Sequence, residues 1–390
     1  MSGNVFYETI LEVLNWLPPT SLPLITGAFF FFVFFQFYAS VQFRQAITYG
    51  AGINKYGFLW FLLFLYSIFA YNSPDFLGYI RALYFGAKSN EIEAFEDIYV
   101  WLLREIEYNN ILFRIIIYSI TYAFIYHIFK HYVLYKGVFL ILYIIILLSP
   151  ISNLVRASMA DAVAFLGIFV LYNNHTKANN VFKFIILFSA ALLLHKSTFL
   201  LIVPLLLSFL PFNNNSVKLY VGFYPAIAIV LVVIVMILKD VLGGGYASDE
   251  FDNNAAYILR KVVTSGMTFV IWAKVLMLGF KYKNRKDLYG YTYRFLFFSM
   301  LIWIGLLFVP MSHYVSERFM SHCLLPLAFY LSYIIGIEGC KLRRRTRKSL
   351  IFLMFCYAII NILDNIYNLY AFTIHLHGKY EYLLSAPTLN

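Results

Sequence analysis

The chain has 390 residues, of which 62% are hydrophobic, 20% aromatic and only 13% charged. About a quarter of the residues of a soluble domain are charged, so this composition excludes a soluble globular enzyme, and its hydrophobicity also excludes disorder. The formal net charge of +11 is therefore first a topology signal, whose meaning depends on the connections that carry Lys and Arg. We predict an all-α fold: a polytopic membrane helical bundle in which residues 1–390 form a single membrane domain.

Residues 1–22 are predicted to form an interfacial N-terminal helix, because Val5, Ile10, Val13, Leu14 and Leu17 stand among polar residues. No basic residue precedes Arg44, so a cleavable signal peptide is not expected. Beyond this helix, apolar runs of spanning or nearly spanning length recur throughout the chain. About 12 membrane segments are predicted, near residues 23–43, 57–71, 111–128, 137–151, 154–173, 181–194, 197–210, 220–239, 262–280, 295–311, 320–338 and 350–371.

The runs within 181–210 are predicted to be a short broken pair. A single helix there would place Lys177 and Lys218 on opposite sides of the membrane, whereas two arms hinged at residues 195–197 keep them on one side. Each arm is shorter than the roughly 30 Å hydrocarbon core, so the hinge is expected at membrane depth. A break at that depth is allowed only where it lines a wet cavity or is buried in protein.

Lys and Arg are concentrated in one alternating set of connections, which carries 18 of the 30 basic residues. The opposite set carries nearly all of the acidic residues. Because basic connections stay in the cytoplasm, both termini are predicted on the outer side. The basic residues of the set are Arg44, Lys55, Lys130, Lys136, Lys177, Lys183, Lys218 and those of 281–294 and 341–348.

The largest outer connection, residues 72–110, is predicted to hold an amphipathic helix, since Ile92, Phe95, Leu102 and Ile106 recur at helical spacing between acidic residues. The short basic runs within 281–294 and 341–348 are interpreted as contacts with anionic membrane lipids, and no nucleic acid is expected as a partner. The sequence contains no nucleotide-binding or metal-binding motif, so we expect neither a cofactor nor a metal.

Ionisable groups in membrane segments are costly and usually face a cavity or a partner. Asp75 is either the start of a helix after Pro74 or a carboxylate at the mouth of an outer cavity. Arg156, at the outer start of a span, either contacts lipid headgroups or binds phosphate. Asp161 lies five residues deeper, about 140° around the helix, so it needs a partner on another helix or is protonated.

Three further polar groups are expected near the outer face. His195 and Lys196 interrupt an apolar stretch at the predicted hinge, which favours a functional role. Arg318 and His322 are four residues apart and share a helix face, either as an interfacial charge cluster or as part of a site. The last span carries a polar stripe that either bonds another helix or lines the outer cavity; its residues are Asn361, Asp364, Asn365 and Asn368.

The charged groups near the outer face together predict pyrophosphate binding and a proton transfer. Arg156, Lys196 and Arg318 are cations that would hold a pyrophosphate without a metal, while His195 or Asp75 would deprotonate a sugar hydroxyl. That set fits glycosyl transfer from a lipid-pyrophosphate donor, in which the cations stabilise charge on the leaving group. Asp161, His322 and Asp364 are candidate cavity-lining residues.

The order of these features resembles that of the EpsG/Wzy-type polysaccharide polymerases of bacterial inner membranes. The resemblance covers residues 70 to 330 and rests on short motifs, whose order and placement carry the signal. They are Asn72-Ser73-Pro74-Asp75-Phe76-Leu77-Gly78-Tyr79 after the second span, Arg156-Ala157-Ser158-Met159-Ala160, Leu194-His195-Lys196-Ser197 with Pro204, and Arg318-Phe319.

The resemblance implies polymerisation of O-antigen, capsule or exopolysaccharide repeat units on undecaprenyl pyrophosphate, at the periplasmic face of the inner membrane. The donor and acceptor would both be undecaprenyl-pyrophosphate-linked oligosaccharides, and a separate chain-length regulator is a candidate partner. On this basis Arg156 and Arg318 are assigned to pyrophosphate, with Lys196 as a weaker member, and either His195 or Asp75 is the base.

Three other functions are weighed against this one. A lipid-linked oligosaccharide flippase would carry charges along a path through both halves of the bundle. Here the charges within the membrane segments are predicted mostly in the outer half. An O-antigen ligase would carry a large late outer loop, whereas the one near 312–318 is short. A polyprenyl-linked glycosyltransferase would carry paired acidic residues in the first outer loop, whereas Asp75 has no acidic neighbour.

Overall fold

The computed structural model describes residues 21–50, 52–70, 102, 110–153, 155–222, 255–307 and 313–385, and all regular structure within them is helical. Among these residues, five helices are long and apolar enough to cross a membrane: Leu112–His131, Val155–Asn173, Val263–Tyr282, Leu324–Lys341 and Arg344–Ile366. The prediction of an all-α bundle with membrane-spanning helices is confirmed at this level. The count of 12 segments and the single-domain organisation stay predictions.

The predicted apolar runs coincide with helices, except that 220–239 lies almost entirely outside the described residues. The predicted helices at 1–22 and within 72–110 also fall there, apart from their last residues. The elements are α2 (Ser21–Tyr49), α3 (Tyr56–Phe69), α6 (Asn110–His131), α7 (Lys136–Leu142), the π-helix η1 (Tyr143–Leu147), α8 (Leu148–Asn153), α9 (Val155–Asn173), α10 (Ala178–Leu194), the 3₁₀-helix η2 (Lys196–Leu201), α11 (Ile202–Leu207), α12 (Asn214–Gly222), α14 (Ala255–Gly279), the 3₁₀-helix η3 (Phe280–Tyr282), α15 (Leu288–Leu306), α16 (His313–His322), α17 (Leu324–Glu338), the 3₁₀-helix η4 (Gly339–Lys341) and α18 (Arg344–Ser385).

One predicted span is divided. The run at 320–338 was expected to be continuous, but α16 ends at His322 and α17 begins at Leu324. Pro326 explains the break, because its nitrogen has no hydrogen to donate to the carbonyl of His322, four residues earlier, and its ring crowds that carbonyl. Arg318 and His322 therefore lie on a short helix of their own rather than at the start of a long span.

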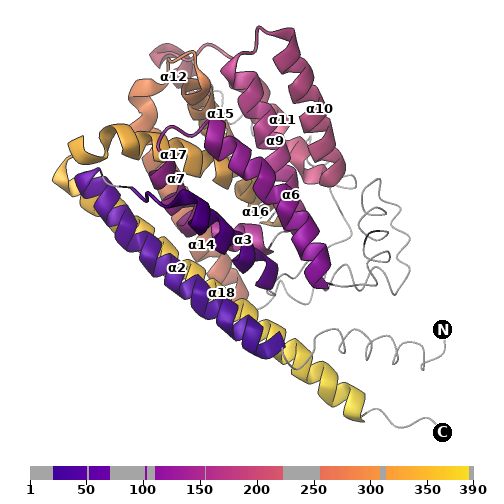
Figure 1. The fold of residues 1–390 in the computed structure, drawn as a ribbon. Helices are drawn as coiled ribbons and strands as arrows, with labels where there is room; N and C mark the ends of the chain where they lie inside the picture. The colour runs from indigo at the N-terminus through magenta and orange to yellow at the C-terminus, as the bar shows by residue number, and fades with distance from the viewer. Residues whose placement is uncertain are drawn as a thin grey trace.

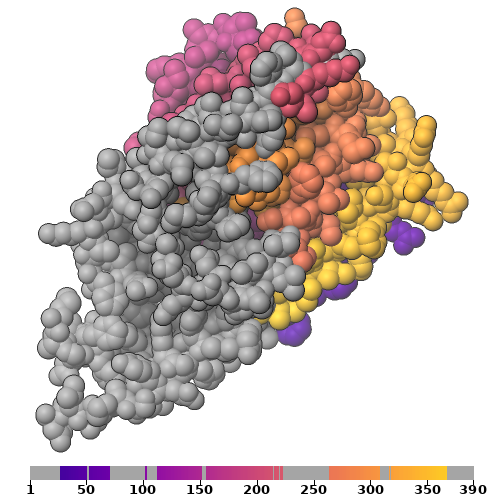
Figure 2. All heavy atoms as spheres, turned by 180° about the vertical axis from the view of Figure 1, so that it is seen from behind, coloured from indigo at the N-terminus to yellow at the C-terminus, as the bar shows by residue number. Residues whose placement is uncertain are grey.

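Two long helices, α2 and α18, lie side by side along one edge of the bundle and run in opposite directions (Figure 1). Seen from behind, α18 lies next to α14 (Figure 2). On the other side of the bundle α9 packs between α6 and α10. This arrangement encloses the segment formed by α7, η1 and α8.

The enclosed segment is the centre of the core, and its residues from Val138 to Leu148 are all buried. In the π-turn, each amide bonds the carbonyl five residues earlier instead of four. This shift leaves carbonyls of η1 open to hydrogen bonds from side chains of other helices. Gln36 of α2 donates to the carbonyl of Ile144 (2.8 Å), and Asn361 of α18 donates to that of Ile145 (2.5 Å). Asn361 thus confirms the predicted interhelical bonding of the last span, and so does Asn365, which donates to Ser149 Oγ (3.1 Å).

Several of the basic connections meet at one end of the bundle. The hydroxyl of Tyr289 donates to the carbonyl of Tyr132 (3.1 Å), and Tyr291 stacks on Tyr172. Nearby, a Cβ on Gly137 would come within 2.6 Å of the Ile53 amide nitrogen, so only glycine permits this approach of two connections. The predicted grouping of basic connections is therefore present at this end, called the basic end below.

Candidate functional site

The chain breaks between α10 and η2, as predicted for residues 195–197. His195 adopts an extended conformation (φ −159°, ψ 112°) after α10 ends at Leu194, and η2 begins at Lys196. The backbone remains hydrogen-bonded through the turn, because Thr198 N donates to the carbonyl of His195 (3.1 Å). His195 and Ser197 are 4% and 3% exposed, so the break is buried in protein, one of the two settings that membrane depth allows.

A chain of hydrogen bonds links this break to two other helices. The hydroxyl of Ser197 is 2.8 Å from Nε2 of His322 on α16, and Nδ1 of His322 is 2.5 Å from Oδ1 of Asp161 on α9. A carboxylate accepts from Nδ1, so that nitrogen carries the proton and Nε2 is left to accept from the serine hydroxyl. Asp161 thus has the partner on another helix that its position required.

Three basic side chains lie near His195. Arg318, Arg156 and Lys196 all lie close enough to act electrostatically on it, and so does His322. The rings of His195 and His322 are 6.0 Å apart. Arg156 is only 8% exposed, and Arg318 and Lys196 are half-buried. The structure therefore brings together five of the predicted site residues, together with Asp161 through His322; we call Asp161, Arg156, His195, Lys196, Ser197, Arg318 and His322 the break cluster.

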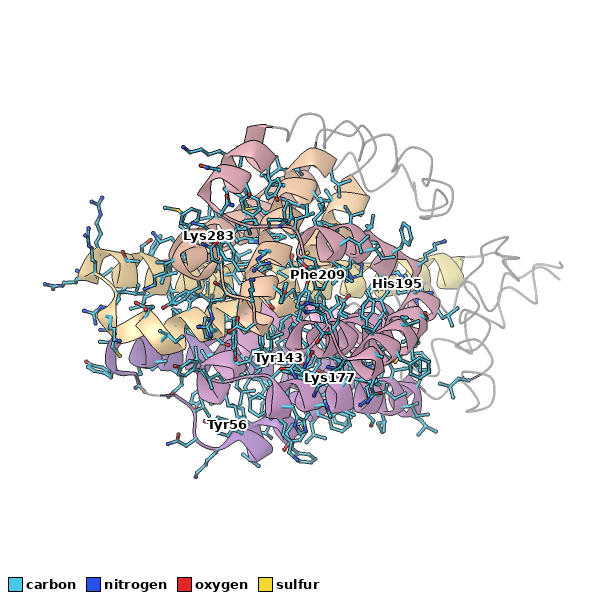
Figure 3. The ribbon with its side chains drawn as sticks, turned by 90° about the horizontal axis from the view of Figure 1, so that it is seen from above. Tyr56, Tyr143, Lys177, His195, Phe209 and Lys283 are labelled. Carbon is cyan, nitrogen blue, oxygen red and sulfur yellow. The ribbon has the colours of Figure 1, made fainter. Side chains whose placement is uncertain are left out.

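The break cluster lies at the end of the bundle opposite the basic end. Arg156 precedes Tyr172 by 16 residues of α9, and a rise of about 1.5 Å per residue separates the two by roughly 24 Å. Tyr172 belongs to the basic end through its stacking on Tyr291. Lys283 of the basic end and His195 are also well separated in a view from above (Figure 3).

A small pocket opens beside Asp161. Its polar lining comes from Asp161, Ser158 and Ser321, and its other walls are apolar residues of α6, α8 and α17 with η1. The side chain of Asp161 is 15% exposed, whereas that of His322 is fully buried. The carboxylate therefore borders the pocket with one face while it holds the imidazole with the other.

Two predicted site residues are not placed in the break cluster. Asp75 lies outside the described residues. Asp364 is half-buried on α18 and acts electrostatically on Tyr357, which accepts a hydrogen bond from Thr268 of α14. Its predicted cavity-lining role stays a prediction. Within the described ranges, no three His, Cys, Asp or Glu side chains gather as a metal site would require.

Sequence reasoning missed the direct role of Ser197. Ser197 was named only as the last residue of the Leu194-His195-Lys196-Ser197 motif, and no local pattern connects it with a histidine 125 residues later. The unpaired aspartate at 161 was the one signal that a distant partner had to exist.

The chain was also compared with protein-family models, with curated proteins and with solved structures, and nothing matched in any of the three. Its function is therefore argued from its residues and their geometry.

Proposed function

We propose that this chain is an inner-membrane glycosyltransferase that polymerises a surface polysaccharide. It transfers the growing glycan from undecaprenyl pyrophosphate onto a new lipid-linked repeat unit at the periplasmic face. The observation that carries the proposal is the break cluster, in which Arg156, Lys196 and Arg318 all act electrostatically on the buried His195 in a membrane bundle. The resemblance to EpsG/Wzy-type polymerases, which rests on several of the same residues, supports it.

The chemistry of the cations fits a pyrophosphate. Guanidinium groups bind phosphate oxygens through paired, charge-assisted hydrogen bonds, and Arg156 and Arg318 approach the cluster from different helices, α9 and α16. When the bond between the anomeric carbon and the pyrophosphate breaks, negative charge develops on the leaving oxygen. Cations held in a water-poor site stabilise that charge more strongly than they would in water.

The position of the cluster supports the assignment to the outer face. Basic connections stay on the cytoplasmic side, so the basic end is proposed to be cytoplasmic. The break cluster, at the opposite end, then faces the periplasm, where lipid-linked repeat units are polymerised. Membrane lipids surround the bundle, and a chain-length regulator is proposed as a protein partner.

A flippase is the main alternative, and the central segment argues against it. A transporter needs polar groups along a path through both halves of the bundle, because ionisable groups in membranes mark such paths. Between the break cluster and the basic end, the residues from Val138 to Leu148 are buried, and they are apolar apart from the hydroxyl of Tyr143. The described part of the chain therefore favours chemistry at one face over passage through the bundle.

Deletion of the gene in the source bacterium tests the function. The surface glycan, or lipopolysaccharide where the cell makes one, is expected to carry a single repeat unit. Loss of all repeat units would instead indicate a flippase or a ligase. An unchanged ladder of polymer lengths would refute the proposal.

Substitutions in the complemented deletion strain test the site. Arg156→Ala and Arg318→Ala are expected to abolish polymer while the protein remains in the membrane at normal abundance. Arg347→Ala is the matched control, because it removes the same charge from the basic run at the start of α18. Full-length polymer in both cluster variants would refute pyrophosphate binding by these residues.

A further inference from the structure

The hydrogen bonds among Ser197, His322 and Asp161 have a directional order. The carboxylate holds Nδ1 of the imidazole, and Nε2 faces a hydroxyl group. Enzymes that activate a hydroxyl use this same connectivity, in which the carboxylate fixes the tautomer and stabilises the imidazolium that forms. The three residues come from η2, α16 and α9, so tertiary folding alone brings them together.

We propose that these residues are a proton relay for the glycosyl transfer, and this inference rests on the proposed function. The acceptor hydroxyl gives its proton to Ser197 Oγ as Ser197 gives its own to His322 Nε2. The freed acceptor oxygen bonds the anomeric carbon of the donor, and the bond from that carbon to the pyrophosphate oxygen breaks with its electron pair. The proton then returns from His322 through Ser197 to the departing pyrophosphate, which restores the starting state.

The two engaged nitrogens of His322 explain why a serine stands between substrate and base. His322 is fully buried, and both of its ring nitrogens are engaged, so it cannot contact a substrate directly. Ser197 is the end of the relay that adjoins Lys196, one of the cations of the break cluster. A hydroxyl there would accept the proton within reach of the bound pyrophosphate.

The charges favour His322 over His195 as the final proton acceptor. Burial first, and then like-charge repulsion from Arg318, Arg156 and Lys196, oppose a positive charge on the His195 ring. His322, by contrast, has a carboxylate beside it: Oδ1 of Asp161 lies 2.5 Å from its Nδ1 and is placed to stabilise an imidazolium. His195 is thus suited to binding the donor, and His322 to carrying the proton.

The test separates turnover from donor binding in the full-length protein reconstituted in lipid nanodiscs. Initial rates are measured with the lipid-linked repeat unit extracted from cells that lack the gene, and binding is measured with undecaprenyl pyrophosphate. Ser197→Ala and Asp161→Asn are expected to lower kcat by about 100-fold or more, the size of a general acid–base contribution. Their affinity for undecaprenyl pyrophosphate should stay within about threefold of wild type, because the cations are retained.

Conservative and control variants complete the test. Ser197→Thr keeps a hydroxyl and should recover most of the rate lost in Ser197→Ala. His175→Asn removes an exposed histidine that packs against Tyr291 at the basic end and should leave the rate unchanged.

Each contrary outcome has a distinct meaning. Near-wild-type turnover in Ser197→Ala or Asp161→Asn would overturn the relay and leave the proposed function intact. Loss of affinity in parallel with the rate would assign the residues to binding or structure and also overturn it. A covalent adduct trapped on Ser197 and identified by mass spectrometry would replace the relay with a serine nucleophile. Wild-type protein that neither binds nor transfers would refute the proposed function, and this inference with it.

Discussion

The buried Arg294 should be a principal support of the basic end, and its replacement gives a quantitative test of the fold. Arg294 is 6% exposed and donates to the backbone carbonyls of Lys283 (3.2 Å), Ser208 (3.3 Å) and Arg285 (2.5 Å). One guanidinium thus joins the end of α11 to the connection between η3 and α15. Its plane also lies over the ring of Tyr291, with its central carbon 4.8 Å from the ring centroid.

Arg294→Met keeps the approximate length of the side chain and removes every donor. Hydrogen bonds from charged groups contribute roughly 1.5–3 kcal/mol each, and the two longer ones belong at the low end of that range. Methionine recovers part of the packing, so we expect a net loss of about 3–5 kcal/mol, the size seen when one member of a buried polar arrangement is removed. An unfolding entropy of about 2.1 cal/mol/K per residue makes this a fall in Tm of about 4–6 °C.

A buried thiol provides the assay. Cys323 is fully buried, whereas Cys340 is exposed and Cys356 is partly exposed. In a background with Cys340→Ser and Cys356→Ser, a thiol-reactive dye added during heating reports the unfolding that exposes Cys323. Arg285→Met is the matched control, because it removes the same charge from a side chain that is 45% exposed and pairs with Asp287. Exposed pairs contribute about 0–1 kcal/mol, so its Tm should fall by about 1 °C at most. Equal shifts in the two variants would refute the reasoning.

Three further substitutions test other parts of the fold, the first two in the same thermal assay and the third by amide hydrogen exchange. Asn361→Leu removes the side-chain bond to η1 and should cost about 1 kcal/mol, as interhelical bonds in membranes do; a more stable variant would contradict it. Gly336→Ala places a Cβ 2.0 Å from the ring of Tyr135 and should cost about 1–3 kcal/mol, but much less in a Tyr135→Ala background; equal costs in both would show that the ring is not the obstacle. Arg114→Met removes the donor to the last carbonyls of α3 and should speed amide hydrogen exchange there, whereas unchanged exchange would exclude this capping role.

Helix positions were the most predictable part of the structure, because long apolar runs must satisfy their backbone groups within the segment. The break at residues 195–197 was predictable too, since a continuous helix would have moved basic connections across the membrane. The break at Cys323 was missed, although Pro326 carries the signal for it. The run is so apolar that its hydropathy predicts one continuous span. The effect of a proline on helix hydrogen bonding has to be considered separately from hydropathy.

The candidate site was predictable as a set of residues and not as an arrangement. Arg156, His195 and Arg318 stood out because charge is costly in a membrane segment. Their proximity depends on how α9, η2 and α16 pack, which no local pattern records. The bond between Asp161 and His322 shows the limit clearly: the sequence implied that Asp161 needs a partner, while 161 residues separate it from the one it has.

Stability and chemistry are divided between the two ends of the bundle. At the basic end, buried donors satisfy backbone carbonyls and aromatic rings stack, as Arg294 and Tyr291 illustrate, and these contacts hold the helices in place. At the opposite end, Arg156, Lys196 and Arg318 gather around one histidine, an arrangement in which neighbouring positive charges repel one another. The side chains of this cluster come from α9, η2 and α16, so it depends on the packing of three separate elements. Under the proposed function, the cations of the break cluster serve ligand binding, whereas the contacts of the basic end support the fold.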